Sequence, residues 1–405
     1  MLARVWLFFT PALAIGAATL LAPRVELLPP TLAGLKSWGP LLLILLAGTL
    51  AFGFNRGRAL FAVATLAAAF AGYELFLSAG QTDFTARTVY AAICIFVPLD
   101  LLALSQLRER GIFTLYGIRR GGSIALQILL TAWVASDHAA QFTQFAYMPL
   151  FDTPAFASSP IPQLGQLLLL LGASACGVMS LMKRSTLDAG LTGALAALGV
   201  ACDGVANPHV FQVFVGTAAL IVTATLLQDA FRLAFQDELT GLPSRRAFNE
   251  RLLALGHRYA IAMVDVDHFK GFNDQHGHEL GDQVLKMIAA RLARVGGGGR
   301  AYRYGGEEFA VVFAGRSLGD AVRRLEAVRR EIEDYRVAVR APDRPPSERR
   351  AHPRSPARPI ATVSVTISAG IAERNERNPT AQAVLQAADK ALYRAKGKGR
   401  NQTCW

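Results

Sequence analysis

Two aspartates in the second half of the chain, Asp265 and Asp267, directly follow an apolar run with the pattern of a buried strand. We predict a strand over 259–265 that delivers both carboxylates at its C-terminal end. A loop and then a helix from about Glu279 should follow, because apolar residues recur there with helical spacing. These are Val284, Leu285, Ile288 and Leu292. The end of this strand is therefore a candidate site for chemistry that uses carboxylate side chains.

A second acidic group follows a glycine pair. Two alternating, strand-like runs are joined by Gly305-Gly306, a pattern typical of a hairpin. Glycines allow positive φ and let a phosphate approach the backbone closely. Glu307 therefore emerges at a turn near Asp265, with Glu308 beside it. Converging carboxylates of this kind bind Mg²⁺, which prefers oxygen ligands and keeps part of its shell for substrate phosphates. Either motif alone would be interpreted as solvated turn carboxylates.

The segment upstream must position these groups. The last apolar segment of the first half runs on as a helix into LLQDAFRLAFQDELTGLPSRRAF, where Gly241-Leu242-Pro243 breaks it. Ser244 is a good N-cap for the next helix, RRAFNERLLAL. Little sequence separates the two halves, so we expect no long coiled coil or extra sensor module between them.

Charge divides the chain into two parts. The chain has 405 residues, is 52% hydrophobic and has a net charge of +12. Up to Asp229 it holds 12 Lys and Arg and 10 Asp and Glu, whereas the remainder holds 30 and 20. The average is too apolar for a soluble enzyme, and the apolar character lies in the first part. We predict a membrane domain over 1–230 and an α/β catalytic domain over 231–405.

Eight stretches of the first part are long and apolar enough for a bilayer core, which requires about 20 mostly apolar residues per helix. They lie at roughly 3–22, 38–54, 59–80, 87–107, 121–139, 162–182, 186–203 and 208–230. The first is interpreted as a span, since no small-residue cleavage site follows it. The predicted fold is thus a polytopic α-helical membrane domain with about eight spans.

Lys and Arg are enriched in cytoplasmic loops, which allows an orientation to be predicted. With an even number of spans and a cytoplasmic C-terminus, the inner loops carry Arg56, Arg58, Arg108, Arg110, Arg119, Arg120, Lys183 and Arg184. The outer loops carry only Arg24, Lys36 and Arg87. The chain is therefore expected to be multi-pass in the bacterial inner (cytoplasmic) membrane, with both termini and the catalytic domain in the cytoplasm.

Polar residues within or near the spans are Glu74, Asp100, Asp137, His138, Asp203 and His209. A carboxylate in lipid is costly, so Glu74 is a candidate functional residue. Alternatively, it is protonated or hydrogen-bonded to a neighbouring helix near the outer interface. The pair Asp137-His138 could join a ligand or metal site, or serve a structural role at a helix end.

Five segments of the second part resemble, in order, the signatures of the GGDEF-family diguanylate cyclases. These are DELTGLPSRRAF, DVDHFKGFNDQHGHELGD, RYGGEEF, VSVTISAGIA and AADKALYRAKGKGRN, covering residues 237–401. The resemblance implies a palm-like βαββαβ core related to nucleotide cyclases. It also implies a reaction that joins two GTP molecules into cyclic di-GMP and releases two pyrophosphates.

The resemblance also implies roles for individual residues. The metal ligands would be Asp265, Glu307 and the backbone carbonyl of Val266, holding Mg²⁺ (or Mn²⁺), two ions per active site. The catalytic residues would be Glu307, Glu308 and Lys270, with Glu307 helping to deprotonate the attacking 3′-hydroxyl. The substrate-binding residues would be Asn273, His278, Asp282, Gly305, Gly306, Lys396 and Arg400. Of these, Asn273 and Asp282 would bind the guanine edge, and Lys396 and Arg400 would neutralise phosphates together with Lys270.

One such domain binds one GTP, so two domains must face each other and the enzyme would be a two-fold homodimer. The expected partners are GTP, a second copy and the lipid bilayer. No nucleic-acid binding is expected, because the basic residues lack aromatic interleaving. Many members of the family also carry an Arg-x-x-Asp motif that binds the product and slows the enzyme. Its two positions here hold Gly296 and Gly299, so no inhibitory site is expected.

A basic, proline-rich insertion at about 340–359 departs from the family pattern. Its composition cannot form a packed core, so it is interpreted as a disordered loop, with contact to anionic lipid headgroups as the alternative. Two other functions remain open for the whole chain. One is a non-catalytic GTP-binding or product-binding regulator on the same fold, and the other is a transporter or channel.

Overall fold

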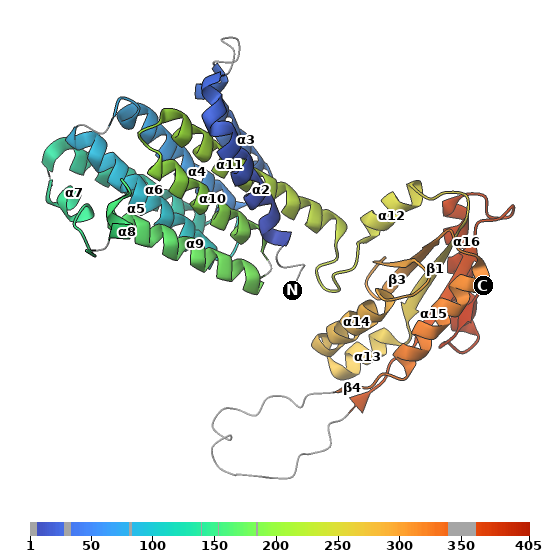
Figure 1. Ribbon diagram of the computed structural model, residues 1–405. Coiled ribbons are helices and arrows are strands. Elements are labelled where there is room, and N and C mark those ends of the chain that lie inside the picture. The colour runs from blue at the N-terminus through green and yellow to red at the C-terminus, as the bar shows by residue number, and fades with distance from the viewer. Residues whose placement is uncertain are drawn as a thin grey trace, which may run out of the picture. The chain divides into compact units, whose positions relative to one another are not determined.

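The structure, a computed structural model, describes residues 6–27, 34–80, 83–138, 140–152, 154–183, 185–338 and 362–405. The chain divides into two compact units, Met1–Ala230 and Phe231–Trp405 (Figure 1). The insertion predicted at about 340–359 lies outside the described residues, as does Arg184 of the predicted inner loops. Their predicted roles therefore stay predictions.

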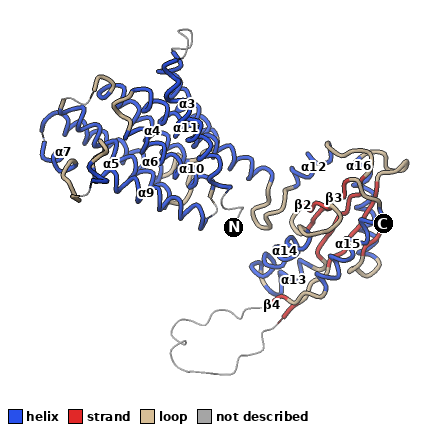
Figure 2. The backbone as a smooth tube through the Cα atoms, viewed as in Figure 1, coloured by secondary structure: helices blue, strands red, loops and turns tan. Residues whose placement is uncertain are grey.

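The first unit consists of helices joined by short connections (Figure 2). The long helices are α2 (Phe9–Leu21), α3 (Gly34–Gly53), α4 (Gly57–Gly72), α5 (Phe84–Gln106), α6 (Leu115–Trp133), α9 (Gln163–Lys183), α10 (Thr186–Asp203) and α11 (Pro208–Phe235). Each of the eight apolar segments of the sequence thus contains a helix. The short helices α7 (Ala140–Ala146) and α8 (Pro154–Ala157) lie between α6 and α9, in the segment between the predicted spans 121–139 and 162–182.

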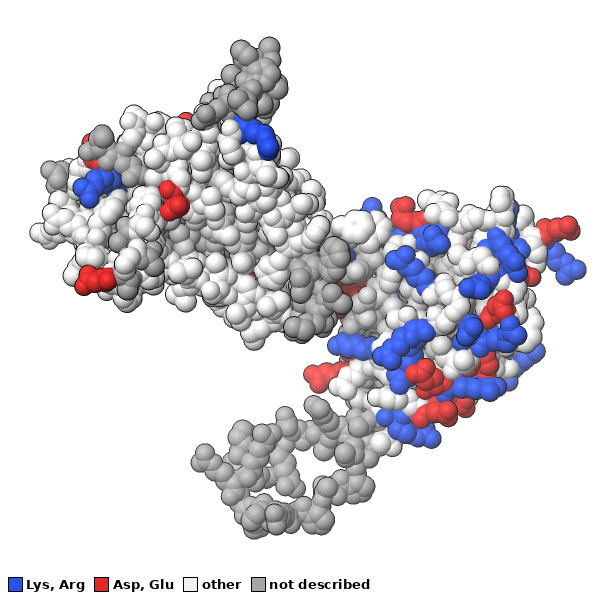
Figure 3. All heavy atoms as spheres, viewed as in Figure 1, with Lys and Arg blue, Asp and Glu red and all other residues white. Residues whose placement is uncertain are grey.

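Four of the described helical segments are long and apolar enough to cross a membrane. They are Gly57–Leu77, Phe84–Gln106, Gln163–Lys183 and Pro208–Phe235. The first consists of α4 and a π-helical turn, η4 (Tyr73–Leu77), and a second π-helical turn, η5 (Val134–His138), follows α6. Figure 3 shows few charged side chains on the visible face of this unit and many on that of the second.

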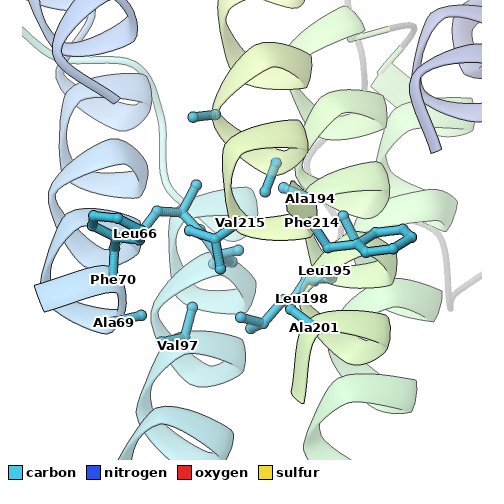
Figure 4. Packing of buried hydrophobic residues seen from close by; sticks show 14 of the residues in the cluster. Leu66, Ala69, Phe70, Val97, Ala194, Leu195, Leu198, Ala201, Phe214 and Val215 are labelled. Atoms are coloured by element: carbon cyan, nitrogen blue, oxygen red, sulfur yellow. The ribbon is translucent and has the colours of Figure 1, made fainter. Parts of the chain in front are cut away.

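The core of the first unit forms where α4, α5, α10 and α11 pack together. Figure 4 shows Leu66 and Phe70 from α4, Val97 from α5 and Val215 from α11 turned toward one another. Small residues such as Ala194 and Ala201 on α10 belong to the same cluster. Small side chains let helix backbones approach closely, so packing as well as apolar composition holds these helices together.

A buried ion pair links two helix starts. The guanidinium of Arg58, the second residue of α4, pairs with the carboxylate of Asp188 in the first turn of α10, and both side chains are buried. Arg58 Nε also donates to the backbone oxygen of Leu104, at 2.6 Å. Lys183 Nζ donates to the oxygen of Ser105 at 3.0 Å, near the same point. Arg58, counted among the loop charges from the sequence, thus lies directly after the α3–α4 connection, where Asp188 pairs with it and both side chains are buried.

Glu74 has a hydrogen-bond partner on another helix. Its Oε1 accepts from Nε2 of the buried Gln212 on α11, at 2.7 Å. Asp203 accepts from the hydroxyl of Ser159 at 2.6 Å. The contact of Glu74 agrees with the structural alternative for this residue. The side chains of Asp137 and His138 lie outside the described part of the structure.

The second unit is built on a five-stranded sheet in the order β2-β3-β1-β6-β7. Its strands are β1 (Tyr259–Val266), β2 (Gly299–Arg303), β3 (Glu308–Ala314), β6 (Ile367–Glu373) and β7 (Thr403–Cys404). Only the β6–β7 pair is parallel; β1 pairs antiparallel with both β3 and β6. Every residue of β1 is buried, as expected for a central strand covered on both faces.

Helices cover both faces of this sheet. Alternate residues of β1, Ala260 to Val266, share one cluster with α14 (His278–Leu292) and α15 (Leu318–Glu333). The other face packs against α12 (Arg245–Leu253) and α16 (Ala381–Gly397). The two-residue strands β4 (Val337–Ala338) and β5 (Thr362–Val363) form a separate pair. The second unit is therefore a three-layer α/β structure.

The structure differs from the sequence-based prediction at three points in this unit. The predicted loop after β1 contains a helix, α13 (Phe269–His276). The strand predicted at 360–367 is displaced to β6, which begins at Ile367. Ser244 occupies the N-cap position of α12, but its hydroxyl donates to the backbone oxygen of Ala234 at 3.0 Å instead of capping the helix. Ser244 thus ties α12 to the end of α11.

Candidate active site

The strand register brings the two acidic motifs together. Asp265 of β1 lies directly opposite Glu308 of β3, so the turn that precedes β3 lies at the C-terminal end of β1. The hairpin loop is longer than the glycine pair, since it runs from residue 304 to residue 307. Glu307 is the last residue of that loop. The sequence-based prediction that Glu307 emerges near Asp265 agrees with this register.

The glycine pair leaves space around the turn for neighbouring groups, and it does not adopt an unusual backbone conformation. Neither Gly305 nor Gly306 has a positive φ, although glycine allows one. A Cβ on Gly305 would lie 2.9 Å from Oε2 of Glu308. No heavy atom lies within 4 Å of the position of a Cβ on Gly306. Gly305 therefore leaves room for the Glu308 carboxylate, and Gly306 leaves the turn open.

Lys396 reaches the acidic group from α16. Asp265 lies on the sheet face that packs against α16, because it alternates with Ile261 and Met263 along β1. The distance from Lys396 Nζ to Asp265 Oδ1 is 2.9 Å. The Asp265 side chain is only 8% exposed, whereas that of Lys396 is 36% exposed. The ammonium group therefore lies between a buried carboxylate and solvent.

The two carboxylates at this point have raised pKa values. Burial raises the pKa of Asp265 despite the opposing effect of Lys396. The pKa of Glu307 is also raised, first by burial and then by the charge of Asp265. Burial thus makes both carboxylates costly to ionise, and an ionised Asp265 adds to that cost for Glu307, so a cation bound here would be stabilised by both carboxylates.

The donor set at this strand end fits a divalent cation that prefers oxygen. Asp265 and Glu307 would supply carboxylates, and Val266, the last residue of β1, would supply a backbone carbonyl. The described residues contain no group of three or more His, Cys, Asp or Glu in a metal-binding arrangement. Ligands from the protein would therefore be few, as is usual for Mg²⁺ sites that leave positions for substrate phosphates.

Asp267 has a structural role that separates it from Asp265. Its two carboxylate oxygens accept from the hydroxyls of Ser368 and Thr366, at 2.6 and 2.7 Å. Its Oδ2 also accepts from the backbone N–H of Asn401, at 3.0 Å. Asp267 thus fastens the segment after α16, which carries Arg400, to the end of β1. Arg400 lies near the acidic group, since its charge opposes the rise in the pKa of Asp265.

A second group of predicted residues lies where α13 meets α14. Asn273 faces Gly281, and a Cβ there would lie only 1.9 Å from Asn273 Oδ1. That oxygen is buried and has no hydrogen-bond partner among the described residues. Asp282 follows Gly281 and is exposed, as is His278 at the start of α14. The structure thus brings Asn273 and Asp282 to one junction, with one acceptor still unsatisfied.

The exposed predicted residues stand apart from the carboxylates. Lys270 lies on α13 and His278 on α14, and both side chains are exposed. In the described portion of the chain, neither residue forms a hydrogen bond or ion pair with Asp265 or Glu307. Only Lys396 and Arg400 of the predicted cationic residues are therefore brought to the acidic group.

Sequence reasoning missed Arg303, which holds the turn. Its Nη2 donates to the backbone oxygen of Gly306 at 2.7 Å, and its Nη1 lies 2.7 Å from Oδ1 of Asp237. Asp237 follows the end of α11 by two residues. Burial raises the pKa of Asp237, but hydrogen bonds from Thr240 and Arg303 outweigh it, and its pKa is lowered. Both residues occur in the quoted motifs, but their separation of 66 positions concealed the pairing.

We expect Asp237 and Arg303 to be energetically coupled. In a double-mutant cycle of Asp237→Asn and Arg303→Lys, the free energies of unfolding should give a coupling of about 1–2 kcal/mol. Because the pKa of Asp237 is lowered, its carboxylate is charged at neutral pH and the coupling should be present there. The coupling should disappear as the pH falls through this lowered pKa, because the carboxylate then takes up a proton. Denaturant unfolding of the four proteins measures it.

The pair Asp320–Arg323 supplies the control, since both side chains are largely exposed. Exposed pairs contribute little, so no measurable coupling is expected there. Equal coupling in both cycles would contradict a special role for Arg303.

The loop at 296–299 is shaped by its glycines. Gly297 and Gly298 have φ values of 70° and 75°, which favour glycine. A Cβ on Gly299 would lie 2.6 Å from the ring of Phe313. The side chain of Arg324 packs beside Gly296, 3.3 Å from the position of a Cβ there. The backbone thus favours glycine at 297 and 298, and Phe313 favours it at 299. The loop carries neither a carboxylate nor a guanidinium of its own.

Comparison with known proteins identifies the second unit. Residues 234–402 match the family model described as "Diguanylate cyclase, GGDEF domain". The chain is 38% identical over 173 residues to "Diguanylate cyclase VdcA" of Vibrio cholerae, covering 42% of this chain and 46% of the relative. It is 40% identical over 184 residues to "Diguanylate cyclase DgcP" of Pseudomonas aeruginosa, covering 44% and 24%. This part of the chain is therefore a GGDEF domain.

Among solved structures, the chain is similar to the coiled coil and GGDEF domain of DgcB from Caulobacter crescentus in complex with c-di-GMP. The identity is 32%, the match covers 44% of this chain and 88% of that chain, and the TM-score is 0.38. The chain spans less than half the length of each of the two curated relatives.

Proposed function

We propose that the GGDEF domain of this chain is a diguanylate cyclase, which joins two GTP molecules into cyclic di-GMP and releases two pyrophosphates. The observation that carries the proposal is the carboxylate pair Asp265 and Glu307 at an open glycine turn, with Lys396 beside it. This arrangement lies within the segment that matches the family model. Transfer of a phosphoryl-type group requires mainly positioning and neutralisation of charge, which such a site supplies.

Asp265, Glu307 and the carbonyl of Val266 would hold the divalent cation, Mg²⁺ or Mn²⁺, with two ions per site. When bound, the metal would neutralise phosphate charge and polarise the reacting phosphate. Glu307 would accept the proton of the attacking 3′-hydroxyl, and its raised pKa suits a group that gains a proton during the reaction. Lys396 and Arg400 would stabilise the leaving pyrophosphate.

Guanine would bind at the junction of α13 and α14. The unsatisfied oxygen of Asn273 supports this placement, because the guanine edge offers N–H donors. The exposed carboxylate of Asp282 would accept from the same edge, and adenine lacks the two donors that it requires. Lys270 and His278 would complete the pocket only around bound nucleotide, since both are exposed in the free domain.

Each 3′-hydroxyl must attack the nucleotide of the other site, so we also propose that two copies of the domain face each other with two-fold symmetry. The test uses the full-length chain in detergent with GTP and Mg²⁺, with the products separated by chromatography. Cyclic di-GMP is the expected product, and Asp282→Ala should weaken the preference for guanine over adenine. Folded protein that binds GTP but forms no product would favour the non-catalytic alternative.

We further propose that the first unit is a multi-pass domain of the bacterial inner membrane and controls the cyclase. The four long apolar helices support it. The contacts of Arg58, Lys183 and Asp188 place the α3–α4, α5–α6 and α9–α10 connections at one end. Thr186 pairs with Asp229 near the end of α11, at the same end. Because Lys and Arg gather there, that end and the GGDEF domain would be cytoplasmic.

The orientation predicts the outcome of reporter fusions. Fusions after Arg110 and Lys183 should report a cytoplasmic location, and a fusion after Met148, between α7 and α8, should report the opposite side. Alkaline phosphatase and green fluorescent protein fusions measure the two locations independently. A cytoplasmic report at Met148 would overturn the eight-span arrangement with both termini inside.

We expect the cyclase to lack product inhibition through the loop at 296–299. Gly296 and Gly299 offer no charged side chain to bind cyclic di-GMP, and Phe313 leaves no space for an aspartate at 299. Initial rates should therefore be unchanged by micromolar product added at the start of the reaction. Micromolar inhibition that disappears when residues 296–299 are replaced would refute the expectation.

A further inference from the structure

A cavity of about 460 Å³ lies between α4, α5 and α6. Its wall is almost entirely apolar, with Ala68 of α4, Val89 and Phe96 of α5, and Ile128 of α6 among its lining residues. The volume falls within the range of sites that bind small molecules. The cavity lies outside the GGDEF domain and belongs to the first unit alone.

One polar cluster interrupts the apolar wall, and each of the three helices supplies one of its members. Asp100 of α5 accepts from Nε2 of Gln127 on α6, at 2.9 Å. Its other oxygen lies 3.4 Å from the hydroxyl of Thr65 on α4. Asp100 is half-buried, and among the described residues that line the cavity it is the only ionisable one.

The carboxylate of Asp100 lacks a cation. Within the described segments it forms no ion pair, and its partners in the cluster are two neutral groups. The contrast with Asp188 is direct, because that buried acid of the same unit pairs with Arg58. A carboxylate in apolar surroundings is costly unless a charge or several hydrogen bonds compensate it. The cavity thus presents one carboxyl group, without a cationic partner among the described residues, to whatever occupies it.

Two irregular helix ends border the same cavity. Leu75 and Phe76 belong to the π-helical turn η4, and Ala135 and Ser136 to the π-helical turn η5; all four are lining residues. Turns of π-helix are rare and occur frequently at functional sites. Their convergence on one cavity is independent of the polar cluster and points to a ligand.

We propose that this cavity binds a lipophilic cation, in which an apolar body fills the space between α4, α5 and α6 and a protonated amine pairs with Asp100. The apolar wall would bury the body of the ligand, and the ammonium group would supply the charge that Thr65 and Gln127 do not. Those two residues would hold the carboxylate toward the amine through their existing hydrogen bonds.

Equilibrium binding of radiolabelled dodecylamine to the full-length chain in nanodiscs tests the proposal, with empty nanodiscs subtracted. A saturable component is expected, and it should be displaced by unlabelled amine but not by dodecanol or dodecanoate. Asp100→Asn keeps the size of the side chain and should weaken binding by about tenfold or more. Ala132→Phe, which fills the cavity from α6, should also weaken it. Ala125→Phe, on the same helix but outside the cavity, should not.

Thermal unfolding of each variant in the same nanodiscs establishes that it is folded. Binding that is unchanged in folded Asp100→Asn, or displaced equally by dodecanol, would overturn the proposal and assign the cavity to hydrocarbon alone. The absence of a saturable component in the native chain would also overturn it. Should Asp100→Asn fail to fold, the comparison of Ala132→Phe with Ala125→Phe decides. The readout is binding, so it does not depend on cyclase activity.

Discussion

Replacing Glu307 with glutamine is expected to lower the turnover of the cyclase by at least about a thousandfold. The amide preserves the shape of the side chain but removes one metal-binding charge and the group that accepts the 3′-hydroxyl proton. It also removes one of the two charges that repel each other at the end of β1. The rate of cyclic di-GMP formation under saturating GTP and Mg²⁺ measures the effect.

Glu250→Gln is the matched control, because Glu250 is an exposed carboxylate on α12. Its turnover should remain that of the native protein. GTP binding by Glu307→Gln should persist, since Asn273 and Asp282 are untouched. A Glu307→Gln protein with near-native turnover would contradict the assignment of this site.

The second large effect is structural. A Cβ on Gly370 of β6 would lie 2.0 Å from the backbone nitrogen of Leu392 and 2.1 Å from the backbone oxygen of Ala388. Both atoms belong to α16, so no side-chain rotation can relieve the overlap. Gly370→Ala should therefore lower the free energy of unfolding by about 2–4 kcal/mol. Because α16 carries Lys396, the displacement should also reduce turnover.

Denaturant unfolding followed by circular dichroism measures the change, with Gly319→Ala as the control. Gly319 lies in α15, and no heavy atom lies within 4 Å of the position of a Cβ there. Alanine favours helix over glycine, so this variant should be as stable as the native protein or slightly more so. Equal stability of Gly370→Ala would show that α16 does not depend on close contact with β6.

The local parts of the second unit were predictable from the sequence. An apolar run predicted β1, and alternating runs joined by a glycine pair predicted the hairpin of β2 and β3. The position of Asp265 followed from the end of its strand. The same reasoning placed a loop where α13 forms, because its eight residues are too short and too polar for a clear helical pattern. Whether a short segment forms a helix depends on its contacts with neighbouring elements. The local sequence pattern does not contain that information.

Contacts between residues far apart in the chain could not be predicted from the sequence. The pairing of Arg303 with Asp237 and the close approach of Gly281 to Asn273 depend on the fold. Likewise, Arg58 looked like a loop charge because Asp188 is 130 positions away. Lys396 was predicted as a site residue only from the resemblance to the family. In the structure its ammonium group pairs with the carboxylate of Asp265. Residue type and local spacing predicted candidates, and the fold decided which of them meet.

The most direct test of the central claim is the stoichiometry of the reaction catalysed by the full-length chain. GTP consumed, cyclic di-GMP formed and pyrophosphate released should be measured together in the presence of Mg²⁺, with Glu307→Gln beside the native protein. The account predicts one cyclic di-GMP and two pyrophosphates for every two GTP consumed, and almost no product from the variant. Folded native protein that binds GTP without forming cyclic di-GMP would contradict it.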